Sequence, residues 1–524
     1  MTGCDKIGIG RHSSVGRQIA FPTRASRVAA VVWAVLLTVT TVTGTGVAAT
    51  AAGVSGTVTV RVDASATVGS AARNLVGFGA TATPAELGPL RVRTYRIDAS
   101  LQDLVSCPSG QLDSARVRAL GQRVNALDEF GARVVLIIDY MPPCLAAVPS
   151  GDTGDPTRLP PRDPSRWQQL VTQLVHTLGP ARAEAGKRPV RDYEVWNEPD
   201  LTFFRGTFDQ FVSGLLLPEG RAVQHVAQAS GLELQFGICG CALLATGWLP
   251  RLLAAAHNAG IPVGFLSWHW YGNYPFLGPD GREPGVPPAL YAALAKLNPA
   301  TTPQDFANQV AQVRASAQSI LGHIPELMID EWNLAAGGFD HRMDTNEGAA
   351  YQAAALAVLA AAGLDRALLY TAKDPQSLDA DGHPLPLRYG GWGVLDRSGA
   401  HKPSWYTQWM WQHLGAVRLA APQDPNDNVW SSAGRSARHD HVNVLVATFR
   451  ATGATDRMLD LTVSALRRGR WRVLLYRVDT AHPGSTTPTE EINATVGRDR
   501  TLQLATPLPA QSVVLARITR TETP

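Results

Sequence analysis

The pattern of apolar and polar positions changes character near residue 414. Before that point, short apolar runs alternate with stretches whose apolar residues recur with helical spacing. Residues 134–138 form a continuous, largely β-branched run, which is typical of a strand buried on both faces. The flanking stretches, residues 117–130 and 167–178, each gather their apolar side chains on one helical face. Repeated strand–helix units predict a parallel sheet, in a doubly wound fold or a (β/α)8 barrel.

The rest of the chain extends this pattern and then departs from it. Further strands are expected at residues 192–196, 234–238, 264–268, 326–330 and 367–370, and helices at 248–258 and 347–362. Beyond residue 414, short alternating segments separated by turn residues predict a small antiparallel β domain. Examples are residues 441–449, 458–463, 471–478 and 511–518. Residues 57–63 alternate in the same way, so we expect this strand to associate with the β domain although it precedes the barrel.

These patterns divide the 524 residues into four segments. The expected segments are a signal peptide or membrane-targeting segment (1–52), an N-terminal strand associated with the β domain (53–70), a (β/α)8 barrel (71–414) and a small β-sandwich (415–524). In the first segment, arginines up to Arg27 precede an apolar run over residues 28–42, and Ala49-Thr50-Ala51 fits an A-x-A cleavage pattern. The run is short and threonine-rich for a bilayer span. We therefore expect a secreted or extracytoplasmic protein with a cleaved signal, and an N-terminal membrane anchor as the alternative.

Composition and cysteine content narrow the picture. A formal net charge of +3 gives no basic footprint for nucleic acid, and 45% apolar residues permit a large core. Once the leader is removed, four cysteines remain, and four cysteines allow three pairings. We favour Cys107 with Cys144, because both follow neighbouring predicted strands, whereas Cys239 and Cys241 would close a tight ring or stay reduced. A lone Cys-x-Cys pair is a weak zinc signal, and we expect no metal and no cofactor.

The clearest chemical signal is a pair of glutamates at predicted strand ends. Glu198 lies in the sequence Trp-Asn-Glu-Pro of residues 196–199, and Glu331 directly follows the apolar strand of residues 326–330. Their separation fits three βα units of about 40–45 residues each, which places them on strands four and seven, across the mouth of a barrel. Glycosidic cleavage needs two such carboxylates. One protonates the leaving oxygen, and the other attacks the anomeric carbon or activates water.

Together these motifs resemble those of clan A glycoside hydrolases, and most closely glycoside hydrolase family 39, which contains β-xylosidases and α-L-iduronidases. The resemblance covers roughly residues 75–415. Segments similar to the family's motifs are residues 77–80 at the first strand end, 140–146 at the third, 265–271 at the sixth, and 391–403 as the last strand and closing helix. The resemblance implies a (β/α)8 TIM barrel and a retaining mechanism, with Glu198 as acid/base and Glu331 as nucleophile.

The resemblance also implies residues that bind the substrate. Asn197 is expected to hydrogen-bond the sugar 2-hydroxyl, and His269 and Tyr271 to surround and tune the nucleophile. Trp332 and Trp392 are candidate sugar platforms, with core packing as an equal alternative. The expected partner is an oligosaccharide, a polysaccharide or another glycoside.

The chain departs from the family pattern next to the expected pocket. After the fourth strand a Phe-Arg pair ends in Arg205, and the fifth strand carries Gly-Ile-Cys-Gly-Cys at residues 237–241. The specificity of family members is therefore not transferred, and Arg205 and Lys373 are candidates for binding an acidic sugar. A catalytically silent carbohydrate-binding protein, or an endo-acting polysaccharide hydrolase or transglycosylase, stays open. The Gly- and Pro-rich residues 272–290 are expected to form a long loop beside the cleft.

Overall fold

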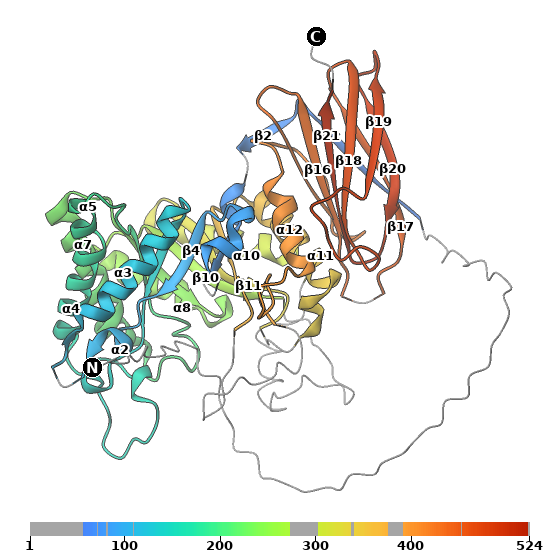
Figure 1. Ribbon diagram of the computed structural model, residues 1–524. Coiled ribbons are helices and arrows are strands. Elements are labelled where there is room, and N and C mark those ends of the chain that lie inside the picture. The colour runs from blue at the N-terminus through green and yellow to red at the C-terminus, as the bar shows by residue number, and fades with distance from the viewer. Residues whose placement is uncertain are drawn as a thin grey trace, which may run out of the picture.

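The computed structural model describes residues 56–70, 72–79, 82–107, 109–272, 302–336, 340–375, 391–451 and 453–521. This part forms a closed barrel with a β domain beside it (Figure 1). The predicted fold class, a (β/α)8 barrel with a β-sandwich, is confirmed. The expected leader and nearly all of the expected loop 272–290 lie outside the described residues. Among the described residues, no helix combines the length and the apolar character needed to cross a membrane.

Eight parallel strands close the barrel in the order of the chain. They are β3 (Gly77–Gly79), β4 (Thr94–Asp98), β7 (Arg133–Ile138), β8 (Asp192–Val195), β9 (Gln235–Cys241), β10 (Phe265–Tyr271), β11 (Glu326–Asn333) and β12 (Arg366–Leu369). Val135, Phe265, Met328 and Leu368 form a separate small core inside the barrel. Side chains from several strands that fill the interior in this way are what a barrel of this size requires.

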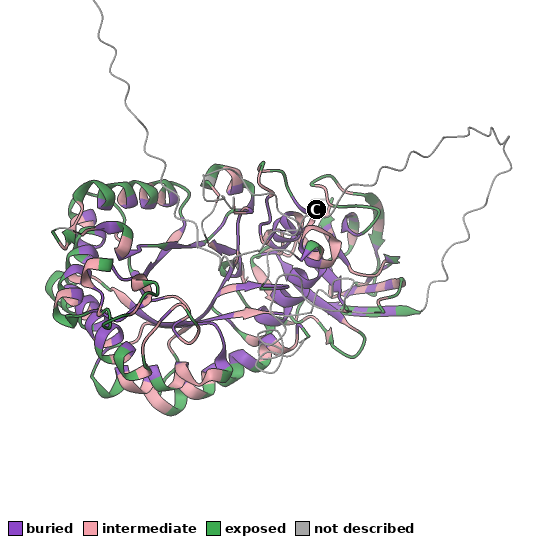
Figure 2. Cartoon of the chain, turned by 90° about the horizontal axis from the view of Figure 1, so that it is seen from below, coloured by how far each residue is buried: buried purple, intermediate pink, exposed green. Residues whose placement is uncertain are grey.

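Helices surround the barrel, with buried inner faces and exposed outer faces (Figure 2). They are α1 (Pro84–Leu87), α2 (Leu101–Leu104), α3 (Ser114–Glu129), α4 (Pro164–Leu178), α5 (Pro180–Glu184), α6 (Phe208–Phe211), α7 (Leu217–Ser230), α8 (Trp248–Asn258), α10 (Asp305–Leu321), α11 (Asn346–Ala362) and α12 (Pro403–Gln412). Asp113 and Asp163 cap α3 and α4, each accepting two backbone N–H bonds. A two-stranded sheet of β5 (Val105–Ser106) and β6 (Gln111–Leu112) precedes α3.

The expectation that residues 391–395 form the last barrel strand is wrong. The eighth strand is β12, whose Leu369 pairs with Phe78 of β3 and with Trp332 of β11. These pairings close the barrel and leave no free strand edge for a later segment. Residues 391–395 instead make isolated bridges, in which Leu395 takes part.

Two stacked sheets form the β domain. The larger sheet contains β2 (Thr67–Ser70), β13 (Val417–Leu419), β14 (Gln423–Asp424), β15 (Val429–Arg435), β16 (His441–Thr448), β18 (Gly469–Val478), β19 (Glu490–Val496) and β21 (Ser512–Arg520). The smaller sheet contains β1 (Thr57–Asp63), β17 (Arg457–Ser464) and β20 (Leu502–Leu508). Strand β1 pairs with β17 in parallel, so the N-terminal strand lies within the β domain and the sandwich is not wholly antiparallel.

The larger sheet is covered on both faces, which fixes the β domain to the barrel. One face packs on the smaller sheet, and the other joins the barrel core. The ring of Phe449 lies 5.2 Å from that of Tyr351 in α11, and Tyr476 lies 5.2 Å from Trp409 in α12. Burial on both faces explains why residues 441–449 are almost continuously apolar.

Two disulfide bonds lie at the end of the barrel that carries the strand C-termini. Cys107 is bonded to Cys144, in the segments that follow β4 and β7. The favoured pairing is therefore confirmed, and its basis was the adjacency of these two strands. Cys239 and Cys241 form the second disulfide, across Gly240 in β9.

Candidate active site

Glu198 lies in the turn that follows β8, the fourth barrel strand. Trp196 and Glu198 have φ values of 58° and 44°, in the left-handed region that residues with a side chain seldom occupy. The backbone N–H of Glu198 donates to the carbonyl of Gly240 at 2.9 Å. The carboxylate of Asp200 accepts two backbone N–H bonds from the loop after β9. These contacts hold the turn in its unusual conformation at the barrel mouth.

Glu331 is presented by a bulge in β11, the seventh barrel strand. Trp268 pairs with Ile329 and His269 with Glu331, so Asp330 is an extra residue in the strand. Consecutive residues Asp330 and Glu331 therefore both reach Arg96 of β4, at 2.9 and 2.8 Å. Without the bulge, neighbouring strand positions would face opposite sides of the sheet.

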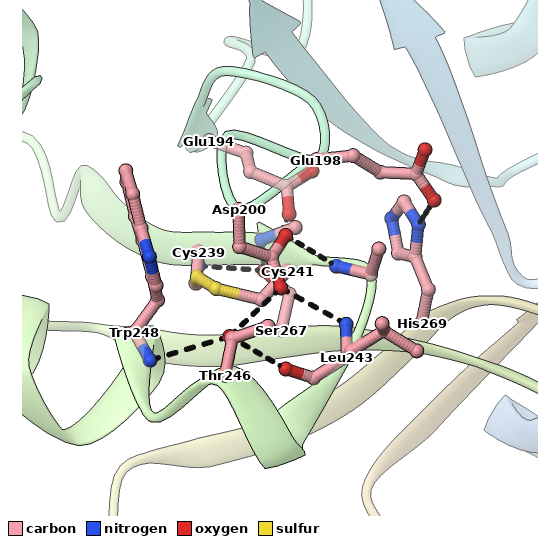
Figure 3. The surroundings of a disulfide bond; sticks show 12 residues. Glu194, Glu198, Asp200, Cys239, Cys241, Leu243, Thr246, Trp248, Ser267 and His269 are labelled. Carbon is pink, nitrogen blue, oxygen red and sulfur yellow. Dashed lines mark hydrogen bonds and ion pairs between the residues drawn. A yellow bond between two sulfur atoms is a disulfide. The ribbon is translucent and has the colours of Figure 1, made fainter. Parts of the chain in front are cut away.

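Glu198, Glu331 and His269 converge at the mouth. One ligand atom from each of the three side chains lies within 4.8 Å of the other two. His269 Nδ1 is 2.8 Å from Glu198 Oε1 (Figure 3) and 3.6 Å from Glu331 Oε2. The hydroxyl of Tyr271 donates to Glu331 Oε2 at 2.9 Å. The structure thus brings together four of the residues that the sequence singled out.

Asn197 lies beside this group. Its Oδ1 accepts a hydrogen bond from Arg96 Nη2 at 3.1 Å. Because the amide oxygen is engaged, the amide nitrogen is the atom available to donate to a sugar hydroxyl. This geometry is compatible with the role that the resemblance implies for Asn197.

Burial and neighbouring charges shift the protonation of the site. Burial raises the pKa of Glu198, and the hydrogen bond to His269 lowers it. The negative charge of Glu331 raises the pKa further, so the pKa of Glu198 ends above its usual range. Burial lowers the pKa of His269, but the carboxylates of Glu331 and Asp330 outweigh it and leave the pKa well above the usual value. Burial, followed by the charge of Glu331, raises the pKa of Tyr271 well above its usual value. These shifts favour the cationic form of His269 and the protonated, hydrogen-bond-donating form of Tyr271.

The same three groups form the one cluster with metal-ligand spacing among the described residues. A metal ion would need the neutral imidazole of His269. Despite burial, Glu331 and Asp330 raise the pKa of His269 well above its usual value, which disfavours the neutral imidazole that a metal ion would need.

The sequence analysis did not identify four residues of the site, which are Arg96, Glu194, Ser267 and Asp330. Arg96 binds Glu194 at 2.8 Å, and Ser267 donates to the same carboxylate. Burial raises the pKa of Glu194 to about 8. For Asp330, burial is outweighed by Arg96 and the nearby histidine, which lower the pKa to about 2. The available signal was Arg96 itself, a charged residue in the interior of a buried strand, where it needs anionic partners.

Of the two roles considered for Trp332, a sugar platform and core packing, the structure supports core packing. Its side chain is completely buried and packs edge-to-face on Phe306 of α10, with ring centres 5.9 Å apart. Trp332 follows Glu331 in the strand, so it faces the helices instead of the mouth. Trp392 is half-buried against Tyr370, at 5.5 Å between ring centres, and stays a candidate.

The two cations considered for an acidic sugar already have acidic partners. Arg205 Nη2 is 2.7 Å from Asp152 Oδ1, and Lys373 Nζ is 2.7 Å from Glu86 Oε1. Each positive charge is thus balanced within the protein. The structure gives no support to an anion-binding role for either residue.

Comparisons with known proteins agree with the fold and the motifs. No protein-family profile matches the chain. A β-xylosidase of Caldicellulosiruptor saccharolyticus is 31% identical over 158 residues, which is 28% of this chain and 29% of that protein. The chain thus matches less than a third of the length of this curated relative.

Two crystal structures are similar over most of the chain. A monomeric β-xylosidase from Caulobacter crescentus CB15 is 20% identical, with a TM-score of 0.68, and the match covers 88% of this chain and all of that one. The GH39 enzyme from Xanthomonas axonopodis pv. citri is 20% identical, with a TM-score of 0.67, over 88% and 97% of the two chains. The resemblance inferred from the motifs is therefore confirmed: the chain is similar in part of its sequence to a β-xylosidase, and in fold to enzymes of glycoside hydrolase family 39.

Proposed function

We propose that the protein is a retaining glycoside hydrolase in which Glu198 is the acid/base and Glu331 the nucleophile. The observation that carries this proposal is the approach of their carboxylate oxygens to within 4.8 Å. Retaining enzymes hold their two carboxyl groups about 5–5.5 Å apart, whereas inverting enzymes leave about 6.5–9.5 Å for a water molecule. The similarity to a β-xylosidase supports the same class of reaction.

In the first step, Glu331 attacks the anomeric carbon while Glu198 transfers its proton to the leaving oxygen. Both oxygens of Glu331 are oriented, one by Arg96 at 2.8 Å and the other by Tyr271 at 2.9 Å. These two bonds aim the carboxylate before the substrate arrives, which lowers the reorganisation needed during the attack. The products of this step are a free alcohol and a glycosyl ester on Glu331.

In the second step, Glu198 takes a proton from water, and the water oxygen attacks the anomeric carbon and releases Glu331. The change of role follows from charge. The anionic Glu331 is one cause of the raised pKa of Glu198, and this cause disappears when Glu331 is esterified. The pKa of Glu198 then falls, and the ionised carboxylate can act as the base.

A panel of aryl glycosides tests the proposal. The protein without its leader would be assayed on α- and β-xylosides, glucosides, galactosides, arabinosides and uronides, and then on polysaccharides. Glu331→Gln serves as the background. Release above this background, with a product of the same anomeric configuration by NMR, is the expected result. Wild-type rates in Glu331→Gln, or an inverted product, would contradict the assignment.

Azide separates the roles of the two glutamates. With an activated leaving group, azide should restore turnover in Glu331→Ala and give a glycosyl azide of inverted configuration. In Glu198→Ala the glycosyl azide should retain the configuration, because it forms from the covalent intermediate. The same configuration from both variants would mean that the roles are wrongly assigned.

We also propose that the protein is exported. Its support is the positive, apolar and small-residue order of the first segment, together with two disulfides that an oxidising compartment maintains. Expression with the leader attached should release mature protein whose N-terminus lies near residue 52. Retention of the intact leader on a soluble cytoplasmic product would refute export.

A further inference from the structure

The Cys239–Cys241 disulfide lies next to the turn that carries the proposed acid/base. The bond encloses Gly240, and both cysteine side chains are completely buried. Figure 3 shows this ring beside Asp200, Ser267 and Glu194. The mechanism described above gives this disulfide no part, and its sulfur atoms are too deeply buried to meet a substrate.

Gly240 touches the acid/base through its backbone. Its carbonyl accepts the N–H of Glu198 at 2.9 Å. A Cβ on Gly240 would lie 3.1 Å from the carbonyl oxygen of Trp196 and 3.3 Å from Arg96 Nη2, and the residue has a φ of 51°. The close approach and the positive φ favour glycine at this position, but glycine is also the residue whose backbone is least restricted. Because glycine has no side chain that restricts its backbone, neighbouring groups must hold the Gly240 peptide in place.

The amides of the ring are connected to the proposed nucleophile as well. Ser267 Oγ accepts the N–H of Cys239 at 3.2 Å and that of Gly240 at 3.1 Å, and it donates to Glu194. Glu194 in turn binds Arg96, which holds Glu331. The position of the ring is thus coupled to both catalytic glutamates.

Immediately after the ring, the chain contacts the acid/base turn a second time. The N–H groups of Ala242 and Leu243 donate to Asp200 at 2.9 and 3.0 Å. Asp200 is two residues from Glu198, so the segment from Cys239 to Leu243 supports the turn at two points.

We propose that the Cys239–Cys241 disulfide is a positioning element for proton transfer by Glu198. It restricts the Gly240 peptide, whose carbonyl then holds the backbone of Glu198 in its left-handed conformation. The inference rests on the proposed glycosidase function. It adds that the disulfide acts on the step that protonates the leaving group, through Glu198 and without contacting the substrate.

The leaving group separates positioning from general stability. The 2,4-dinitrophenolate group of an aryl glycoside can leave as an anion without protonation. The alkoxide of an alkyl glycoside is a poor leaving group and must be protonated by the acid as it leaves. In Cys239→Ser/Cys241→Ser we expect kcat/KM to fall about 10- to 100-fold on the alkyl glycoside, because small misplacements of catalytic groups have effects of this size. On the dinitrophenyl glycoside we expect a change of less than about threefold, since kcat/KM reports only the step that forms the glycosyl-enzyme.

Cys107→Ser/Cys144→Ser is the matched control, because it removes the other disulfide at the same end of the barrel. Its losses should be equal for both leaving groups. Equal losses in the Cys239/Cys241 variant as well, or no loss on either substrate, would overturn the proposal. If the rate of the wild type does not exceed the background rate of Glu331→Gln on any substrate, the proposed glycosidase function is contradicted. This result is distinct from equal losses in the Cys239/Cys241 variant, which contradict the positioning role.

Two measurements cover the covalent state and the folding of the variant. Denatured, unreduced wild type treated with iodoacetamide should show no label on Cys239 or Cys241 by mass spectrometry, and labelling there would overturn the proposal. Folded Cys107→Ser/Cys144→Ser protein without its leader, which contains Cys4, carries free thiols only at the Cys239–Cys241 pair after reduction with a phosphine. It should show the same leaving-group dependence without having to fold in the absence of the disulfide, and equal losses on the two substrates would again contradict positioning.

Discussion

Replacing His269 with asparagine should move the alkaline limb of the pH–activity profile upward. His269 donates from Nδ1 to Glu198 at 2.8 Å and is completely buried. An asparagine amide can offer a neutral donor at a similar place, so the substitution removes the charge more than the bond. The bond and the charge of His269 both lower the pKa of Glu198, against the raising effects of burial, Glu331 and Asp200.

The magnitude follows from the kinds of hydrogen bond. A bond to a charged group contributes about 1.5–3 kcal/mol, and a neutral one about 0.5–1.5 kcal/mol. The difference of about 1–1.5 kcal/mol corresponds to about one pKa unit. In the proposed mechanism the first step needs protonated Glu198, so we expect the loss of this proton to set the alkaline limb of kcat/KM. Losing a cation that favours the ionised form raises this pKa, and the limb should move upward by about one pH unit.

The assay is kcat/KM for a 4-nitrophenyl glycoside across the pH range in which the wild type and variant are folded. Tyr271→Phe is the control, because Tyr271 binds Glu331 and its hydroxyl is neutral. It should lower the rate and leave the alkaline limb in place. An alkaline limb that stays fixed or moves down in His269→Asn would refute the view that a histidine cation lowers the pKa of Glu198.

Three further predictions concern stability and specificity. Burial raises the pKa of Glu219 well above its usual value, and the hydrogen bond from Trp167 opposes this shift. Above about pH 4.3 the unfolded chain releases the proton of Glu219 while the folded protein keeps it, so the free energy of unfolding of the wild type should fall as pH rises. Glu219→Gln lacks this titration, so its free energy of unfolding relative to that of the wild type should increase by up to about 1.4 kcal/mol per pH unit. Chemical unfolding at several pH values measures this difference, and a difference that does not change with pH would contradict the prediction. Arg366→Met should lower the free energy of unfolding by about 3–5 kcal/mol, because buried Asp192 would keep only the half-exposed Arg133 as counter-charge. The kcat of the folded fraction should stay unchanged. Glycosides of neutral sugars should be cleaved at least about tenfold faster than uronides, since both candidate cations are already ion-paired, and preferred cleavage of a uronide would refute this.

The barrel strands could be predicted where their side chains are apolar on both faces. β7 is such a strand, and its limits were predicted to within one residue. β4 escaped prediction because Thr94, Arg96 and Asp98 interrupt its apolar residues. These side chains point to the barrel interior, and the carboxyl groups that bind Arg96 come from β8 and β11, far away in the sequence. Only the closed barrel reveals the partners that make a buried arginine tolerable.

The site was predictable as a pair of strand-end glutamates but not in its details. Glu198 is marked by Asn-Glu-Pro, and Glu331 by its place after an apolar strand. The bulge at Asp330 has no local sequence signal, since it is defined by the register with β10. For the same reason, the sequence could not tell that Glu331 faces the mouth and Trp332 the helices.

In the proposed mechanism, the charge balance of the site favours a proton on Glu198. Arg96 and His269 supply two positive charges, and Asp330, with its pKa lowered to about 2, supplies one negative charge. Glu194 is largely protonated at neutral pH, because burial raises its pKa to about 8. With Glu331 ionised, as the proposed nucleophile must be, the two cations are matched, and a further negative charge on Glu198 would be in excess. The proposed esterification of Glu331 would remove one negative charge and allow one on Glu198, so the same set of residues would favour the acid in the first step and the base in the second.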